Sequence, residues 1–149
     1  MSDQQRRPKP PQQTLDQRRA QHAMKAVEQV KAVQKQDAAK KFGGQARKLP
    51  VRIAASGLGQ ALAFLKAKGY APDLLNSLGD WVLGVVKPAQ DVKSRIDGKP
   101  TDERLLTAVV FGTADFLRQA TDEVLAYLQW LNRFCEATGL TDDVEVVSG

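Results

Sequence analysis

The stretch TADFLRQATDEVLAYLQWLNRFCEATG, residues 113–139, decides the fold because it carries the longest regular helical pattern in the chain. Apolar residues return every three or four positions, which places them on one face of an α-helix. Thr113 predicts the N-cap of this helix, which we expect to run to about Thr138 before Gly139 ends it. The wide apolar face is typical of a helix that packs against several others. Its members are Phe116, Leu117, Ala120, Val124, Tyr127, Leu128, Leu131, Phe134 and Cys135.

Upstream of this helix, apolar residues at helical spacing predict two further helices. Pro72 predicts the first turn of the earlier one, which Pro88 stops. Thr101 predicts the N-cap of the later one, which Phe111-Gly112 ends. The connecting residues 87–100 are polar and contain an Asp-Gly turn signal, so we interpret them as a mobile surface loop.

The first half of the chain contains more helix breakers. Thr14 and Gln17 form a capping-box pattern that opens a long helix to about Lys40, and Gly43-Gly44 is its expected end. Small residues form the apolar stripe of this helix, so another helix can approach it closely. The remaining predicted breaks are Pro50, Ser56-Gly57 and Gly69, which bound a short helix over 45–55 and another over 58–68.

No stretch alternates polar and apolar residues long enough to predict a β-strand. The sequence therefore predicts an all-α, single-domain helical bundle of about five to seven helices, and 149 residues suit one such domain. We expect a disordered, basic and Pro-rich tail over 1–13, the bundle over 14–139, and a flexible acidic tail over 140–149.

The net charge of +5 hides an uneven distribution along the chain. Residues 1–52 carry 13 Lys/Arg and 4 Asp/Glu, a net charge of +9. Residues 53–149 carry 9 Lys/Arg and 13 Asp/Glu, a net charge of −4. Such an asymmetry indicates one face for a polyanion, although a basic segment that only aids solubility would have the same composition.

Little in the sequence indicates catalysis or a cofactor. A single cysteine and a single histidine exclude an intramolecular disulfide and a Cys- or His-rich metal centre, and we expect no metal, no cofactor and no small-molecule substrate. The histidine, His22, lies on a polar arc and is interpreted as a surface residue, whereas Cys135 is interpreted as a buried, inert thiol. No apolar run is long enough for a membrane span and no secretory signal is evident, so we expect a cytoplasmic protein that is not an enzyme.

The basic residues of the first third remain the strongest functional pattern. Few aromatic residues accompany them, with Phe42 the one candidate for base stacking, which favours contacts to the phosphate backbone over base reading. Trp81 and Trp130 are expected in the core, and Asp122-Glu123 on the solvent face of their helix. Arg19 falls inside an apolar arc, either as a snorkelling side chain or as a paired arginine at a protein contact. The predicted RNA-binding residues are Arg18, Lys25, Lys40, Lys41, Arg47, Lys48 and Arg52.

Three segments together resemble a known family: Lys48-Leu-Pro50, Gly57-Leu-Gly-Gln-Ala-Leu-Ala-Phe-Leu65 and Val124-Leu-Ala-Tyr-Leu-Gln-Trp-Leu-Asn-Arg-Phe134. In this order they resemble the small, all-helical subunit of the type III-B CRISPR effector, the Cmr complex, from about Leu15 to Thr138. The chain departs from the family pattern at Phe42, where tyrosine is expected. It departs again at Ala55-Ser56, where asparagine is expected in second place and Ser56 can still cap a helix.

The resemblance implies a non-catalytic, RNA-binding structural subunit that acts in antiviral defence. Members of the family stack in several copies along the guide-bearing backbone, and their basic face lines the channel where target RNA pairs with guide RNA. The implied partners are target RNA, other Cmr subunits and further copies of this chain, without a membrane. Arg19, Gly57, Leu58 and Gln60 become candidate subunit-interface residues. The alternative is a helical adaptor whose basic patch contacts acidic protein surfaces instead of RNA.

Overall fold

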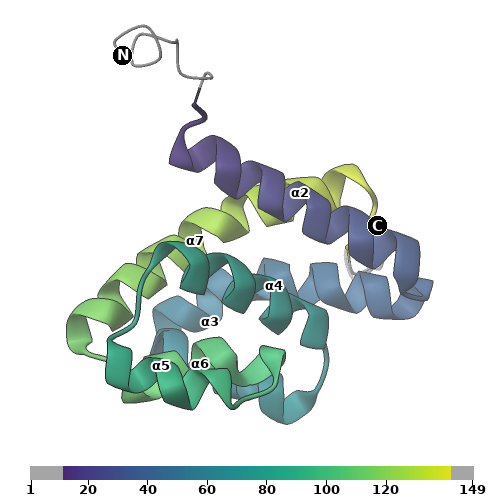
Figure 1. Cartoon of the computed structure of the whole chain (residues 1–149). Helices are drawn as coiled ribbons and strands as arrows, with labels where there is room; N and C mark the ends of the chain where they lie inside the picture. The colour runs from purple at the N-terminus through teal and green to yellow at the C-terminus, as the bar shows by residue number, and fades with distance from the viewer. Residues whose placement is uncertain (1–11, 142–149) are drawn as a thin grey trace, which may run out of the picture.

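A computed structural model describes residues 12–141 as one bundle of six α-helices and a short 3₁₀ helix (Figure 1). None of these residues forms a β-strand. The prediction of an all-α single domain with five to seven helices is therefore confirmed. The elements are α2 (Leu15–Val33), α3 (Gln36–Lys68), α4 (Pro72–Val85), α5 (Gln90–Asp97), η1 (Thr101–Glu103), α6 (Arg104–Phe111) and α7 (Ala114–Ala137).

Helix α7 is the centre of the bundle and packs against α2, α3, α4 and α6. The Thr113 hydroxyl caps its first turn by accepting a hydrogen bond from the Phe116 amide at 3.0 Å. At the other end Gly139 has φ +77°, and the Leu140 amide donates to the Cys135 carbonyl at 2.8 Å. The predicted boundaries and apolar face of this helix are confirmed, except that Leu117 is exposed and Phe134 half-buried.

Helix α2 begins as predicted, since Thr14 and Gln17 exchange both hydrogen bonds of a capping box. Its predicted end near Lys40 is wrong, because the helix stops at Val33 and the chain turns at Gln34. The Gly43-Gly44 pair does not end a helix but lies inside α3. A Cβ at position 43 would lie 1.5 Å from the Leu140 carbonyl oxygen, so this glycine permits a close approach.

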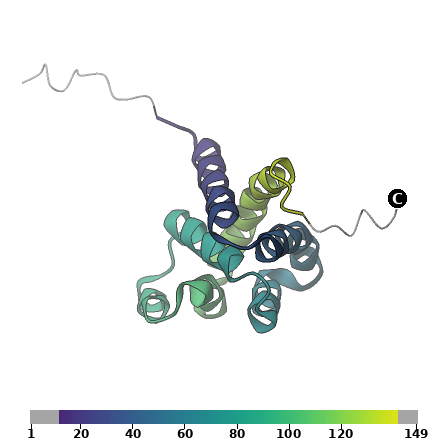
Figure 2. The ribbon, with the colours of Figure 1, turned by 90° about the vertical axis from the view of Figure 1, so that its right-hand side faces the viewer.

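Helix α3 is a helical hairpin, and its sharp turn is at Gly57. This glycine has φ +85° and ψ 162°, a backbone conformation that L side chains rarely adopt. We call residues 36–56 the first arm and residues 58–68 the second arm. Pro50 lies inside the first arm without ending it, whereas the predicted break at Ser56-Gly57 is confirmed. Figure 2 shows the two arms side by side, in dark blue and blue-teal.

The interpretation of residues 87–100 as a loop is wrong, because they contain helix α5. Val92 and Ile96 are buried on its inner face, and α5 packs against α6. Two apolar residues in eight are too few for a recognisable periodicity. Thr101 does not cap α6 but begins η1, and its hydroxyl donates a hydrogen bond to Asn76 Oδ1 at 2.8 Å.

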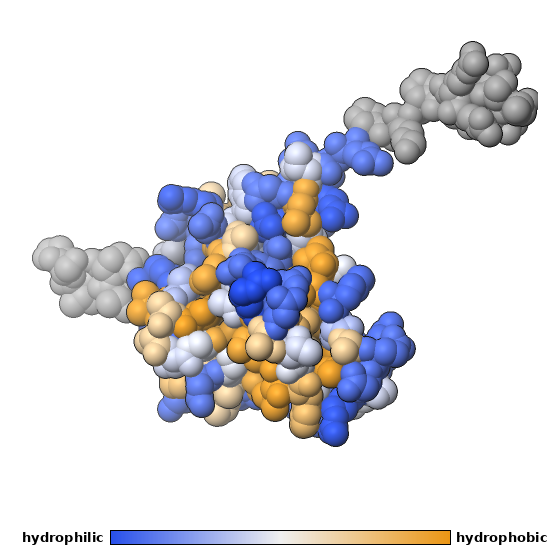
Figure 3. All heavy atoms as spheres, turned by 90° about the vertical axis from the view of Figure 1, so that its left-hand side faces the viewer, coloured by the Kyte–Doolittle hydropathy of each residue, from blue (hydrophilic) through white to orange (hydrophobic). Residues whose placement is uncertain are grey.

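Apolar side chains also reach the surface of the bundle. Figure 3 shows hydrophobic residues interspersed with strongly hydrophilic ones on the face that lies at the left in Figure 1. Large exposed apolar residues lie on several elements, among them Val51 and Phe64 of α3 and Phe111 of α6. Single exposed apolar residues are ordinary in a folded protein, so only those with specific neighbours bear on function.

The predicted tails fall largely on residues 1–11 and 142–149, which lie outside the described part of the chain. One correction is possible at the start of the C-terminal tail. Leu140 is buried against the core, so the folded domain extends one residue past its predicted end at 139. Within residues 12–141, none of the helices has the length and apolar character needed to cross a membrane.

Candidate nucleic-acid interface

Three of the predicted RNA-binding residues form one row along the first arm of α3. Lys41, Lys48 and Arg52 are spaced by seven and four residues, so they lie within about 40° of each other around the helix axis. Lys41 and Lys48 are exposed, and Arg52 is half-buried. We call these three residues the α3 basic stripe.

The structure places the other four predicted residues elsewhere. Lys40 and Arg47 lie roughly 100–120° around the first arm from the centre of the stripe and face the end of α7. Lys40 lines a hollow with Thr138 and Leu140, and Arg47 lines another with Trp130. Arg18 and Lys25 are exposed on α2. The seven residues therefore form three groups, of which the α3 basic stripe is the one with the most members.

Two exposed aromatic side chains, which the sequence reasoning missed, border the α3 basic stripe. The guanidinium carbon of Arg52 lies 4.5 Å from the Phe64 ring centroid, and the Lys41 ammonium lies 5.5 Å from the Tyr70 centroid. The one predicted stacking residue, Phe42, is 1% exposed and belongs to the core. The sequence did indicate that Phe64 is exposed, because on a helical wheel it falls outside the apolar arc of Leu58, Ala61, Leu62 and Leu65.

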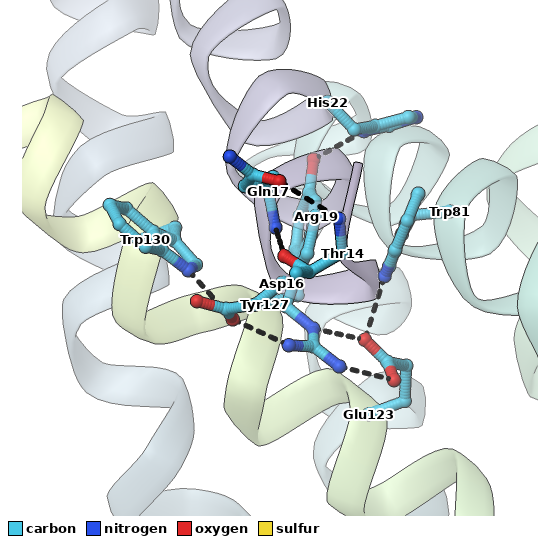
Figure 4. Close-up of polar contacts among 9 residues, drawn as sticks. All are labelled: Thr14, Asp16, Gln17, Arg19, His22, Trp81, Glu123, Tyr127 and Trp130. Carbon is cyan, nitrogen blue, oxygen red and sulfur yellow. Dashed lines mark hydrogen bonds and ion pairs between the residues drawn. The ribbon is translucent and has the colours of Figure 1, made fainter. Parts of the chain in front are cut away.

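Arg19 takes part in an ion-pair network inside the molecule (Figure 4). It donates to both carboxylate oxygens of Glu123 at 2.5 and 2.9 Å, and to Asp16 at 2.6 Å. The indole N–H groups of Trp81 and Trp130 donate to Glu123 and Asp16 at 2.8 and 3.0 Å. The snorkelling interpretation of Arg19 and the solvent-face interpretation of Glu123 are therefore wrong, and the arginine pairs within its own chain.

These contacts change the ionisation of the pair. Burial alone would raise the pKa of Glu123, but hydrogen bonds from Arg19 and Trp81 hold it below its ordinary value. The hydrogen bond to Glu123 likewise raises the pKa of Arg19. Both partners thus stay charged, and they fasten α2 to α7 at a place where both side chains are nearly buried.

His22 also links helices rather than standing on the surface as predicted. Its Nδ1 lies 2.8 Å from the Tyr127 hydroxyl and its Nε2 lies 2.7 Å from an Asp80 carboxylate oxygen. Its ring lies 5.4 Å from the ring centroids of both Trp81 and Tyr127. The cluster therefore connects α2, α4 and α7.

Two reactive groups of this region, the Tyr127 hydroxyl and the Cys135 thiol, are buried away from any substrate. Burial raises the pKa of Tyr127, whose side chain is fully buried, and raises the pKa of the Cys135 thiol to about 12. Asp80 lines a hollow of about 670 Å³ between α4 and α5, but neither His22 nor Cys135 lines it. Within residues 12–141, no three or more His, Cys, Asp or Glu side chains converge in a way that could hold a metal ion.

The candidate interface residues around Gly57 divide between surface and core. Gly57 and Gln60 are exposed at the turn of the hairpin. Leu58 is 1% exposed and packs into the core, and Gly59 lies against Val109 of α6. The hairpin turn therefore presents backbone and a polar side chain to its surroundings, whereas Leu58 stabilises the fold itself.

Comparison with known proteins agrees with the sequence resemblance. Residues 15–138 match the family described as CRISPR-associated protein (Cas_Cmr5). The chain is also 32% identical over 115 residues to the CRISPR system Cmr subunit Cmr5 of Thermus thermophilus. That alignment covers 77% of this chain and 90% of the relative. The chain therefore belongs to the Cmr5 family of CRISPR-associated proteins.

Proposed function

We propose that this chain is a non-catalytic subunit of a type III-B Cmr complex and that it holds target RNA through the α3 basic stripe. The observation that carries the proposal is the alignment of Lys41, Lys48 and Arg52 along one helix face. Membership of the family supports a place in the Cmr complex. The side chains of Cys135 and Tyr127 are buried, so they take no part in catalysis. In the complex, several copies of the chain stack beside the guide-bearing backbone, and the target strand follows their basic surfaces.

The stripe suits the backbone of a nucleic acid better than its bases. From Lys41 to Arg52 it spans about 16 Å along the helix axis at 1.5 Å per residue. Lysine and arginine side chains neutralise phosphates whatever the sequence, and counterion release makes such binding sensitive to salt. A surface of this kind is what a subunit needs if base pairing with a guide supplies the specificity.

Charge reversal along the stripe tests the proposal. Complexes assembled with the Lys41→Glu, Lys48→Glu, Arg52→Glu triple variant should bind target RNA more weakly than complexes with the unaltered chain. The slope of log K against log salt should become shallower by about 2 for each copy that contacts the RNA, because each copy loses three phosphate contacts at about 0.7 each. Circular dichroism should show an intact helical fold. An unchanged affinity and salt slope would remove these residues from the RNA surface.

The same assembly separates RNA binding from an adaptor role. Crosslinking with a lysine-reactive reagent and with ultraviolet light reports protein and RNA neighbours of the first arm separately. Crosslinks of residues 40–52 to target RNA support the proposal. Crosslinks of these residues only to acidic segments of neighbouring subunits would instead assign the stripe to protein contact.

A further inference from the structure

We propose that Phe64 and Tyr70 are stacking platforms for unpaired bases of single-stranded RNA that follows the α3 basic stripe. The inference rests on the proposed function and extends it from the phosphates to the bases. It assigns a binding role to two aromatic residues that the charge pattern of the sequence does not single out. The ligand chemistry is an unpaired nucleobase, of any sequence, attached to a strand whose phosphates meet the stripe.

The hairpin at Gly57 brings the two kinds of side chain together. Arg52 and Phe64 are twelve residues apart, yet the guanidinium carbon lies 4.5 Å from the ring centroid. The Lys68 ammonium lies 5.6 Å from the same centroid, so two cations flank one ring. At the other end of the stripe, Lys41 lies 5.5 Å from the Tyr70 centroid. Each of the two rings thus has at least one cation against it, and proteins that bind single strands combine cations with aromatic rings in this way.

Both rings are partly exposed beside the cations that contact them. Phe64 is 38% exposed and Tyr70 is 39% exposed, although an aromatic ring gains most from burial. Tyr70 also borders a hollow of about 400 Å³ at the place where the start of the first arm meets the end of the second. These two rings therefore offer apolar surface beside cations, which the fold itself does not cover.

The platform at Phe64 is held in place before any ligand arrives. Gln45 is 7% exposed, and its side-chain oxygen Oε1 accepts a hydrogen bond from Arg52 Nη1 at 2.6 Å. This bond fixes the guanidinium over the ring, so less rotamer freedom is lost on binding. A planar guanidinium is itself a surface on which bases stack, so a base can stack on Arg52 where it lies over the Phe64 ring.

The charges around Tyr70 indicate which part of a nucleotide it meets. Asp37 and Asp73 line the hollow together with Lys41. Their carboxylates repel phosphate but can accept hydrogen bonds from exocyclic amino groups of bases. The hollow therefore favours a base, while the phosphates lie toward Lys41 and Lys48. A duplex would keep its base faces stacked internally, so this chemistry selects an unpaired strand.

A matched control exists elsewhere in the molecule. Phe111 on α6 is 50% exposed, and the Arg95 guanidinium carbon lies 4.1 Å from its ring centroid. This pair resembles the Phe64–Arg52 pair but belongs to α5 and α6, outside the hairpin. If exposed aromatic–arginine pairs bound RNA wherever they occur, Phe111 would behave like Phe64.

The first test maps base contacts in the assembled complex. Irradiation at 254 nm with a bound target RNA that carries unpaired nucleotides beyond the guide-complementary segment, followed by tryptic digestion, should give nucleotide adducts on peptide 53–66, which contains Phe64, and on peptide 69–93, which contains Tyr70. The Phe64→Leu variant should lose the adduct on peptide 53–66. Peptide 105–118, which contains Phe111, should carry no adduct.

The second test measures what the bases contribute to affinity. The full-length chain is titrated by fluorescence anisotropy with a single-stranded RNA of about 12 nucleotides and with an abasic strand of equal length. The Phe64→Leu, Tyr70→Leu double variant should bind RNA about thirtyfold more weakly or worse, since each of two stacked bases contributes at least about fivefold, with the salt slope unchanged. The unaltered chain should prefer the intact strand, and the double variant should lose that preference. Phe111→Leu should retain both affinity and preference.

The outcomes separate this inference from the proposed function. If neither peptide carries an adduct, or the unaltered chain binds intact and abasic strands equally, while charge reversal of the stripe still weakens binding, the stacking platforms are overturned and the RNA-binding function stands. If charge reversal has no effect on RNA binding, both fall. Protein crosslinks at Phe64 in place of nucleotide adducts would make the platform a docking site for a neighbouring subunit.

Discussion

At the scale of single residues, Glu123 is the acceptor on which the N-terminal helix depends. Its carboxylate accepts two hydrogen bonds from Arg19 and one from Trp81, and it is 8% exposed. We expect Glu123→Ala to lower the free energy of unfolding by about 3 kcal/mol, because the nearly buried guanidinium keeps only the exposed Asp16 and the Trp81 indole loses its acceptor. Urea denaturation followed by circular dichroism measures the change.

The neighbouring carboxylate provides the control for this prediction. Asp122 is exposed, and its contact with Arg118 is 3.9 Å long. Asp122→Ala should therefore change the free energy of unfolding by less than about 0.5 kcal/mol. Equal effects of the two substitutions would mean that the Arg19–Glu123 pair does not anchor α2.

The carboxylate of Glu123 also makes the stability of the fold depend on pH. The pKa of Glu123 is lowered from an ordinary value of 4.5, so the unfolded chain binds its proton at higher pH than the folded chain. Its stabilising contribution is fully present above about pH 4.5 and is lost as the pH falls through the lowered pKa of the folded state. Hydrogen bonds from Trp130 and Arg19 also lower the pKa of Asp16, so this residue changes stability with pH in the same direction.

We therefore expect the Glu123→Gln variant to be less stable than the unaltered chain at pH 7. Between pH 5 and pH 3 the free energy of unfolding should fall less for the variant than for the unaltered chain. Urea midpoints at pH 7, 5, 4 and 3 measure both effects. Parallel curves for the two proteins would show that protonation of Glu123 does not contribute to acid unfolding.

Sequence reasoning identified the unusual position of Arg19 but not its partner. A helical wheel of α2 places this arginine among alanines and valines. Its partner Glu123 is 104 residues away in the sequence and comes close only because α7 packs beside α2. Likewise, the adjacent Asp122 and Glu123 look equivalent in the sequence, yet one faces solvent and the other faces α2. Partners that are distant along the chain are invisible to local periodicity.

At the scale of elements, the hairpin of α3 depends on one glycine. Gly57 has φ +85°, and nothing lies within 4 Å of the Cβ that a substitution would add, so a substitution there is strained by the backbone alone. Gly57→Ala should cost about 1–3 kcal/mol of stability. Gly84→Ala is the matched control, because position 84 lies in the helical backbone of α4, also with open space around it.

We expect Gly84→Ala to raise stability by about 0.5–1 kcal/mol through helix propensity. The same substitution thus has opposite signs at the two positions, and thermal melts of the two variants are sufficient to show it. A Gly57→Ala variant as stable as the unaltered chain would mean that the turn tolerates another backbone conformation.

Boundary residues made most elements predictable. Thr14, Pro72 and Thr113 open helices as predicted, and Gly69 closes one. The wrong predictions have a common cause, because the same local sequence pattern is compatible with two different structures. The Gly43-Gly44 pair looks like a helix end but permits close packing under Leu140, and the polar run at 87–100 looks like a loop but forms α5.

At the scale of the whole molecule, the charge asymmetry of the sequence becomes an arrangement in space. Residues 12–52, with 10 Lys/Arg and 3 Asp/Glu, contain α2 and most of the first arm of α3. Residues 53–141, with 9 Lys/Arg and 10 Asp/Glu, are nearly neutral and supply the rest of the bundle. The basic segment was evident from composition. The aromatic residues beside it were not, because only the reversal at Gly57 brings Phe64 to Arg52 and Tyr70 to Lys41.

Placement of charge, rather than net charge, should decide RNA binding by this chain. A charge-matched variant tests this directly, because Lys87, Lys93 and Lys99 are exposed around α5, within the acidic part of the sequence. Reversing these three lysines to glutamate changes the net charge by as much as reversing Lys41, Lys48 and Arg52. We expect the α5 variant to keep nearly the affinity and salt slope of the unaltered chain.

The comparison of the two triple variants is informative because long-range attraction and direct phosphate contact depend differently on distance and on salt concentration. Screening at about 0.15 M salt limits an exposed charge to roughly 8 Å, so reversed charges around α5 act on a strand along α3 only weakly. Direct contacts at the stripe release counterions, and their loss lowers the salt slope by about 2. Anisotropy titrations of the two triple variants at several salt concentrations measure both quantities. Equal losses in the two variants would show that the protein attracts RNA through its overall charge and that the α3 basic stripe has no special role.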